Sequence, residues 1–424
     1  MDINRFISEF ITKRPESLLQ QDFIRYRDQL EKQINNKNVL VIGGAGTIGS
    51  HYIKALLKFK VDSLVVVDIS ENGLTELVRD LRSSIGYNIP EKFIAYPVNF
   101  GDPVFEKLFA DHGPFDIVAN FAAHKHVRSE KDIYSVEAMI ENNVLRARGL
   151  LDLLLKHPPE HFFCVSTDKA ANPVNIMGAS KKLMEELIMA YSDQIPITTA
   201  RFANVAFSNG SLPLGFLERL NKKQPWSCPL GIKRFFVSPI ESGELCLMAS
   251  VMGESGDIFY PKLDPEKDMI PFDQIARDLA KYLGLELVEC TSEEEAKKMS
   301  DVRCQISDVG YQMSDVRKPT TGSPIPNPQS PIPVYFFSSD TSGEKPYEEF
   351  FTEQEDRDEE TFTNLGVIKN SRKRPKEEID MIFDQLRSLF ASEKISKTQI
   401  VEILKEYLPG FVHIEKGKGL DERM

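Results

Sequence analysis

The chain has 424 residues, of which 41% are hydrophobic and 27% are charged, an ordinary mixture for a globular protein with more than one structural unit. Its 64 acidic residues outnumber the 52 basic ones, which gives a formal net charge of −12 at pH 7. This acidic balance argues against a general nucleic-acid-binding protein, which needs a basic face.

The cysteines and the apolar runs indicate where in the cell the protein is expected. Five scattered cysteines without a CxxC pair predict neither a disulfide framework nor a zinc site, and we expect no metal. The chain begins with charged and polar residues rather than a signal-peptide core, and no apolar run is long enough for a transmembrane segment. We therefore expect a cytoplasmic protein.

The apolar pattern divides the chain. Residues 1–37 have an amphipathic helical pattern and predict an N-terminal extension for packing or oligomer contact, with a peripheral membrane contact as the alternative. Over residues 38–235, short apolar runs alternate with longer helical stretches, which predicts an α/β Rossmann domain with a doubly wound parallel sheet. We expect an interleaved substrate-binding lobe within 205–365 and a helical tail over 366–424. The proline-rich stretch 318–333 predicts an ordered loop or a linker.

A glycine-rich loop follows the first predicted strand and opens a helix. Gly43, Gly46 and Gly49 have the spacing GxxGxxG. Such glycines allow a tight turn and a close approach of the backbone to a pyrophosphate, which then lies at the positive end of the helix. We predict a dinucleotide site here, which Thr47 and Ile48 also line.

An acidic residue ends the second predicted strand. Asp68 stands 19 residues beyond Gly49, where a carboxylate accepts hydrogen bonds from a ribose 2′-hydroxyl and repels a 2′-phosphate. This favours NAD over NADP; the alternative is that Asp68 only caps the segment that follows. Asn99 and Phe100, after the third strand, are predicted neighbours of the adenine ring.

Reactive side chains follow a later predicted strand. Thr167, Asp168 and Lys169 come at its carboxyl end, where ligands bind in open α/β sheets. A helix is expected to begin near Gly178, so that Met177 and Lys181, four residues apart, share one face.

This stretch closely resembles the nucleotide-sugar 4,6-dehydratases of the capsular polysaccharide biosynthesis group, in the extended short-chain dehydrogenase/reductase superfamily. UDP-N-acetylglucosamine 4,6-dehydratases typify that group. The resemblance runs from about residue 38 to about residue 350. It rests on GGAGTIGS (43–50), AAHKHV (122–127), STDKAANP (166–173), RFANV (201–205), RFF (234–236) and GEKPYEE (343–349).

The resemblance implies an internal redox cycle. Hydride leaves C4 of the sugar for NAD(P)+, water is eliminated across C5 and C6, and the hydride returns to C6. Asp168 would protonate the departing C6 hydroxyl, and Lys169 would remove the C5 proton, which becomes acidic once C4 is a ketone. The alternative is that the two residues form a surface ion pair.

One position departs from the superfamily. Its members usually carry Tyr-x-x-x-Lys, whereas this chain has Met177 four residues before Lys181, and a thioether does no acid–base work. Some dehydratases of this group also carry methionine here. Our hypothesis is that Thr167 holds the C4 hydroxyl and that Asp168 or Lys181 relays its proton. Lys181 is expected to bind the nicotinamide ribose.

Substrate contacts are also implied by the resemblance. Lys125 is expected at a substrate or cofactor phosphate, and Asn204, Arg234 and Glu344 at the nucleotide sugar, since an arginine fork suits a pyrophosphate. Before Glu344 the family usually has Arg-Pro, whereas this chain has Thr341-Ser, so recognition of uridine or guanosine stays open. His124 and His126 are interpreted as structural.

We therefore expect a homo-oligomeric 4,6-dehydratase, by default a dimer, acting on UDP-N-acetylglucosamine or a close relative. The alternatives are a nucleotide-sugar epimerase, including a combined dehydratase and 5-epimerase, and a non-catalytic NAD-binding scaffold. The Asp168–Lys169 pair favours the dehydratase over a simple C4 epimerase, which needs no acid–base pair for elimination.

Overall fold

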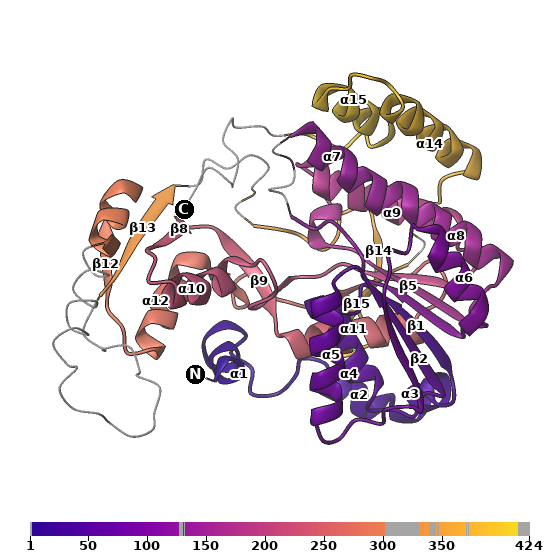
Figure 1. Ribbon diagram of the computed structural model, residues 1–424, viewed down its shortest axis with the longest axis horizontal. Coiled ribbons are helices and arrows are strands. Elements are labelled where there is room, and N and C mark those ends of the chain that lie inside the picture. Colours follow the sequence, from indigo (N-terminus) through magenta and orange to yellow (C-terminus); the bar gives the residue numbers. More distant parts are fainter. Residues whose placement is uncertain are drawn as a thin grey trace.

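The computed structural model describes residues 2–126, 130, 132–301, 331–338, 345, 347–369, 371 and 373–413. These residues form a large α/β body with a smaller lobe beside it (Figure 1). Most of the proline-rich stretch 318–333 and the residues from 414 onward lie outside the described part.

The large body is built on a nine-stranded sheet in the order β14-β15-β10-β6-β5-β4-β1-β2-β3. The strands from β10 to β3 are parallel, and β15 and β14 extend that edge in antiparallel pairing. The predicted doubly wound parallel sheet is confirmed. Its strands are β1 (Asn38–Ile42), β2 (Ser63–Asp68), β3 (Lys92–Pro97), β4 (Ile117–Asn120), β5 (His161–Val165), β6 (Ile197–Ala200), β10 (Ile258–Pro261), β14 (Asp356–Asp358) and β15 (Leu365–Lys369).

Helices cover both faces of this sheet. Alternate side chains of β1 enter opposite cores: Leu40 and Ile42 pack on one face, Val39 and Val41 on the other. Burial on both sides explains why these strands are continuous apolar runs. One face carries α3 (Arg27–Ile34), α4 (Thr47–Leu56), α5 (Glu71–Ser83) and α11 (Pro239–Met252); the other carries α6 (Pro103–His112), α7 (Ile133–Ile140), α8 (Arg146–Lys156) and α9 (Ile176–Ala190).

The smaller lobe has an apolar core of its own, in which Trp226 stacks on Phe216 with ring centroids 4.8 Å apart. Two three-stranded sheets build it, β11-β9-β7 and β12-β13-β8. Its elements are β7 (Asn204–Val205), α10 (Leu212–Asn221), β8 (Trp226–Leu230), β9 (Lys233–Val237), β11 (Met269–Pro271), α12 (Phe272–Tyr282), β12 (Leu287–Cys290) and β13 (Ile332–Ser338).

The chain passes between the two parts several times. Strands β10, β14 and β15 of the large sheet come after residue 235, where we expected the Rossmann domain to end. Strand β15 also crosses the expected start of the tail at 366. These strands are short and follow irregular segments, so the apolar pattern does not single them out. How the chain divides into folding domains stays a prediction.

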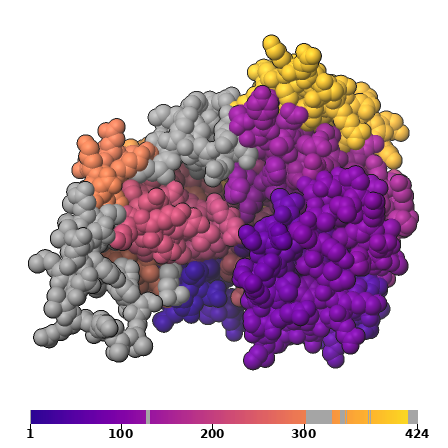
Figure 2. Space-filling model, viewed as in Figure 1, coloured from indigo at the N-terminus to yellow at the C-terminus, as the bar shows by residue number. Residues whose placement is uncertain are grey.

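The N-terminal extension runs along both parts (Figure 1). Phe6, in the short helix α1 (Ile3–Phe6), and Ile11, at the end of the π-helical turn η1 (Ile7–Ile11), pack into the lobe core. After α2 (Gln20–Arg25), residues of α3 pack on the large sheet. Between them, Arg14 pairs with Glu241, with Nε and Oε1 3.0 Å apart. In Figure 2 the indigo N-terminal segment is visible below the junction of lobe and body.

The C-terminal helices α14 (Lys376–Phe390) and α15 (Lys397–Tyr407) form an outer layer, yellow in Figure 2. The guanidinium of Arg148 on α8 lies over the ring of Phe383, and Arg374 pairs with Glu186 on α9. In the part of the chain that the structure describes, no helix combines the length and apolar composition needed to cross a membrane.

Candidate active site

A first cleft opens at the carboxyl ends of β1 to β4, around the glycine-rich loop. A Cβ atom on Gly43, whose φ is +76°, would lie 2.6 Å from the backbone nitrogen of Ala122, and one on Gly49 would lie 2.3 Å from the carbonyl oxygen of Gly43. Only glycine fits these two positions. The cleft is lined by all the predicted cofactor residues except Lys181: Gly43, Gly46, Thr47, Ile48, Gly49, Asp68, Asn99 and Phe100.

Asp68 fastens the glycine-rich loop to the end of β2. One carboxylate oxygen accepts a hydrogen bond from the Ala45 backbone nitrogen at 2.9 Å, and the other accepts from the Ser70 nitrogen at 2.9 Å. Asp68 thus has the local bonding role that we considered as its alternative, and it also lines the cleft. Its contact with a ribose stays a prediction.

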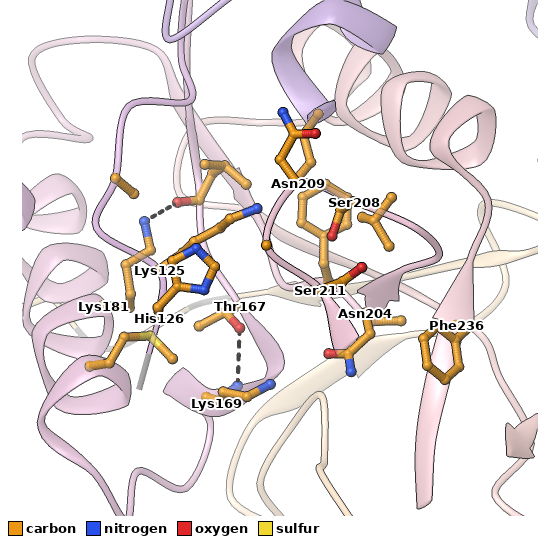
Figure 3. Close-up of a pocket in the computed structure, with 18 of the residues that line it drawn as sticks. Lys125, His126, Thr167, Lys169, Lys181, Asn204, Ser208, Asn209, Ser211 and Phe236 are labelled. Carbon is orange, nitrogen blue, oxygen red and sulfur yellow. Dashed lines mark hydrogen bonds between the residues drawn. The ribbon is translucent and has the colours of Figure 1, made fainter. Parts of the chain in front are cut away.

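A second cleft continues from the first, because Ile48, Phe121, Ala123 and Lys125 line both. One wall belongs to the large body, the other to the lobe (Figure 3). Thr167, Lys169, Met177 and Lys181 lie on the body side, and Asn204, Ser208, Ser211 and Phe236 lie on the lobe side.

The catalytic turn directly follows β5, as predicted. Asp168 begins the 3-10 turn η4 (Asp168–Ala170), and its side chain is only 3% exposed. The Thr167 hydroxyl donates to Asp168 Oδ1 at 2.8 Å, and the ammonium of Lys169 lies 3.0 Å from the same oxygen. The backbone nitrogen of Lys169 also donates to it, at 2.9 Å. One carboxylate oxygen thus joins a hydroxyl to an ammonium, which is the arrangement that proton transfer requires.

Helix α9 packs directly on this turn. It begins at Ile176, two residues earlier than expected, because the side chain of Asn175 caps it by accepting from the Gly178 nitrogen at 2.7 Å. Lys181 is buried and donates to the carbonyl oxygen of Val165 at 2.6 Å (Figure 3). Burial lowers the pKa of Lys181. Met177 lines the second cleft one turn before it.

Some of the predicted substrate-binding residues line the clefts and others do not. Lys125 lines both clefts, and burial lowers its pKa; Asn204 lines the second cleft. Arg234 is absent from the residues lining the two clefts and is only 5% exposed, and its guanidinium donates to the Lys345 carbonyl oxygen at 3.0 Å. In this structure Arg234 holds a neighbouring segment, and its contact with a nucleotide sugar stays a prediction. Glu344 lies outside the described residues.

A buried ion-pair network supports the catalytic turn, and the sequence interpretation missed it. Arg201 lies 2.9 Å from Glu185 and 2.7 Å from Glu355, and the Ser166 hydroxyl donates to Glu185 at 2.6 Å. Burial opposes ionisation of Glu185, but the charges of Arg201 and Lys182 and the hydrogen bonds outweigh it and lower its pKa to about 2. Arg201 stands in the RFANV motif and Glu185 in none of the quoted motifs, and nothing in their spacing links them.

Glu348 was missed too. Its side chain is 4% exposed, and Oε1 lies 3.9 Å from the Lys169 ammonium nitrogen. Burial raises the pKa of this carboxyl. The sequence feature that could have identified Glu348 as a site residue is its place in the GEKPYEE motif.

Residues 39–306 match the family described as "Polysaccharide biosynthesis protein". The capsular polysaccharide biosynthesis protein CapD of Staphylococcus aureus is 25% identical over 374 residues, 87% of this chain and 54% of that protein. This chain therefore spans about half the length of that relative.

Two further groups of relatives have named activities. A UDP-N-acetylglucosamine 4,6-dehydratase (inverting) of Campylobacter jejuni is 27% identical over 62% of this chain and 76% of its own length. A UDP-glucose 4-epimerase of Rickettsia canadensis is 32% identical over 54% of this chain and 66% of its own length.

Among solved structures, Pen from Bacillus thuringiensis has the same fold, with a TM-score of 0.58 and 21% identity over 83% of this chain and 99% of that one. The resemblance stated from the motifs is confirmed by the family match and these relatives. The chain therefore belongs to the polysaccharide biosynthesis protein family, and its relatives include a dehydratase and an epimerase of nucleotide sugars.

Proposed function

We propose that the protein is an NAD-dependent nucleotide-sugar 4,6-dehydratase that converts UDP-N-acetylglucosamine or a close relative to a 4-keto-6-deoxy sugar. The observation that carries this proposal is the cluster of Thr167, Asp168 and Lys169. Thr167 and Lys169 line a cleft continuous with the glycine-loop cleft, and both contact the buried carboxylate of Asp168 behind them. An elimination across C5 and C6 needs an acid and a base side by side, and this cluster offers both. Homo-oligomerisation and the cytoplasmic location stay predictions.

The first cleft fits a dinucleotide. Gly43 and Gly49 leave room that any Cβ atom would fill, and the start of α4 presents backbone N–H groups to a pyrophosphate. Asp68 at the end of β2 would repel a 2′-phosphate, which supports NAD over NADP. When bound, NAD supplies the acceptor for the C4 hydride and returns that hydride to C6.

Thr167, Asp168 and Lys169 each carry out a different part of the proton transfers. The Thr167 hydroxyl holds the C4 hydroxyl of the sugar and passes the proton of that C4 hydroxyl to Asp168. Lys169 takes the C5 proton, and Asp168 delivers its proton to the C6 oxygen, which leaves as water. We favour Asp168 over Lys181 as the relay, because Thr167 donates to Asp168 at 2.8 Å while the ammonium of Lys181 donates to the Val165 carbonyl.

Met177 and Lys181 support this chemistry without exchanging a proton in our scheme. The Met177 side chain forms an apolar part of the cleft wall, and a thioether has no proton to exchange. The buried ammonium of Lys181, which lines the second cleft, adds positive potential there, and we assign it to hold a ribose hydroxyl.

The experiment is incubation of the protein with UDP-N-acetylglucosamine and NAD, followed by mass spectrometry. We expect a product lighter by one water, without net consumption of NAD. Replacing the base, Lys169→Ala, should lower kcat by about 10³-fold, while NAD binding persists. Asp168→Asn should also lose turnover.

Three other outcomes separate the alternatives. An unchanged mass with an inverted C4 centre by NMR would make the protein an epimerase. Loss of water together with inversion at C5 would identify the combined dehydratase and 5-epimerase. Binding of NAD and of a panel of nucleotide sugars without any reaction would favour the scaffold.

A further inference from the structure

Glu348 faces the catalytic lysine from a segment far away in the sequence. Its carboxyl oxygen Oε1 lies 3.9 Å from Lys169 Nζ, which also lies 3.0 Å from Asp168 Oδ1. The charged groups that face Glu348 are Lys169 and Asp168 from the catalytic turn, Arg234 from β9, and Lys345 from its own segment. A carboxyl that is 4% exposed is expensive to keep ionised without a close partner.

The backbone around Glu348 is anchored on both sides. On one side the Lys345 carbonyl accepts a hydrogen bond from Arg234 at 3.0 Å. On the other, the Phe350 carbonyl accepts from the buried guanidinium of Arg201 at 2.9 Å. Glu348 is therefore held against the catalytic turn rather than at the end of a free loop.

The proposed dehydration sets a requirement for Lys169. Its ammonium is 3.0 Å from Asp168 Oδ1, and a nearby carboxylate favours the charged form of a lysine. A base, however, must be a neutral amine when it meets the C5 proton. Lys169 therefore needs a neighbour that takes its proton. The Glu348 carboxyl lies 3.9 Å from the ammonium, and burial raises its pKa.

We propose that Glu348 holds the proton that Lys169 must give up before its amine acts as a base. One N–H bond breaks at Lys169 Nζ and one O–H bond forms on Glu348, so an ion pair becomes a neutral amine and a neutral acid without change in net charge. Lys169 then takes the C5 proton and gives it back when the hydride has reached C6, and Glu348 keeps its proton throughout. Glu348 touches no substrate atom in this scheme and is a positioning residue, and the inference rests on the proposed function.

The first test compares pH profiles of kcat for the wild type and Glu348→Gln. Glutamine has the same shape but cannot take the proton, so Lys169 must lose it to solvent. The wild type should vary little with pH over the neutral range, whereas Glu348→Gln should be about 10²-fold slower at pH 7 and speed up about tenfold per pH unit. Glu348→Asp, which keeps a carboxyl, should restore part of the neutral-pH rate. The matched control is Glu349→Gln, at the exposed neighbour whose carboxylate accepts from the Asn172 side chain at 2.9 Å.

The second test needs no turnover. Reductive methylation with formaldehyde attacks only neutral amines, and peptide mass spectrometry reports the labelling of Lys169. Labelling at neutral pH should be several-fold slower in Glu348→Gln than in the wild type and unchanged in Glu349→Gln. If Glu348→Gln does not fold, Glu348→Asp serves the same comparison with an intermediate rate expected.

The two tests separate this inference from the proposed function. Slower labelling of Lys169 in a protein that dehydrates no nucleotide sugar would uphold the proton arrangement and reject the reaction. Active dehydration with labelling and pH profile unchanged in Glu348→Gln would overturn the role of Glu348.

Discussion

The two walls of the second cleft are held in place by different forces. The body wall, with Thr167 and Lys169, stands at the end of β5. It is braced by Arg201 and Glu185, which are buried, and by the partly buried Glu355. The lobe wall, with Asn204, rests on short strands and on an apolar core to which the N-terminal helix contributes. The body wall adds a charged network to its apolar packing, whereas the lobe wall rests on apolar packing.

This difference has a consequence for function. Catalytic groups must be held within a fraction of an ångström, and a buried, fully hydrogen-bonded network over a parallel sheet provides such rigidity. Recognition of a sugar tolerates more movement, and a lobe built from separate segments can close on its ligand. We therefore assign the chemistry to the body wall and the choice of nucleotide sugar to the lobe wall.

The largest effect on stability is expected from a variant that removes one carboxylate from the ion-pair network of Arg201. Glu185→Gln leaves Arg201 buried with one carboxylate less, which should lower the free energy of unfolding at pH 7 by about 3–5 kcal/mol. Because the folded pKa of Glu185 is about 2 against an ordinary 4.5, its contribution is complete above about pH 4.5 and is lost as the pH falls toward 2. Denaturant unfolding at several pH values measures this.

The contrasting variant is Phe6→Ala in the apolar support of the lobe. Phe6 is fully buried, and its truncation should also cost about 3–5 kcal/mol. This loss should not change between pH 7 and low pH, since no ionised group is removed. Equal pH dependence of the two variants would contradict the comparison.

A smaller effect is expected in the cofactor cleft, which belongs to the body. Gly49→Ala puts a Cβ atom 2.3 Å from the Gly43 carbonyl oxygen, so the loop must move. This movement should cost about 1–3 kcal/mol of free energy. NAD binding measured by calorimetry should weaken about tenfold or more. Gly149→Ala on α8 is the matched control, because its Cβ atom would meet nothing within 4 Å. Normal NAD affinity in Gly49→Ala would show that the loop adapts.

Sequence reasoning found the glycine loop and the turn after β5 but missed the charged groups that support that turn, for a physical reason. The glycine loop and the turn at Thr167 and Asp168 are single stretches of chain whose spacing carries their geometry. Arg234 and Glu348, in contrast, receive their roles from segments that fold back from far along the chain; the carbonyl bonded by Arg234 is 111 residues away. Burial and partner, which decide what a charged side chain does, are set by the fold and not by local pattern.

The smallest effect is expected from a variant that tests whether the lobe wall selects the nucleotide sugar. Asn204→Ala removes a polar group that faces the cleft from β7 and should leave the catalytic turn intact. If the lobe wall selects the substrate, KM for the nucleotide sugar should rise about tenfold, corresponding to about 1.4 kcal/mol of lost binding, with kcat nearly unchanged. Steady-state kinetics with saturating NAD separates the two constants. A fall in kcat at constant KM would instead place Asn204 with the chemistry, and the division of labour between the walls would not hold.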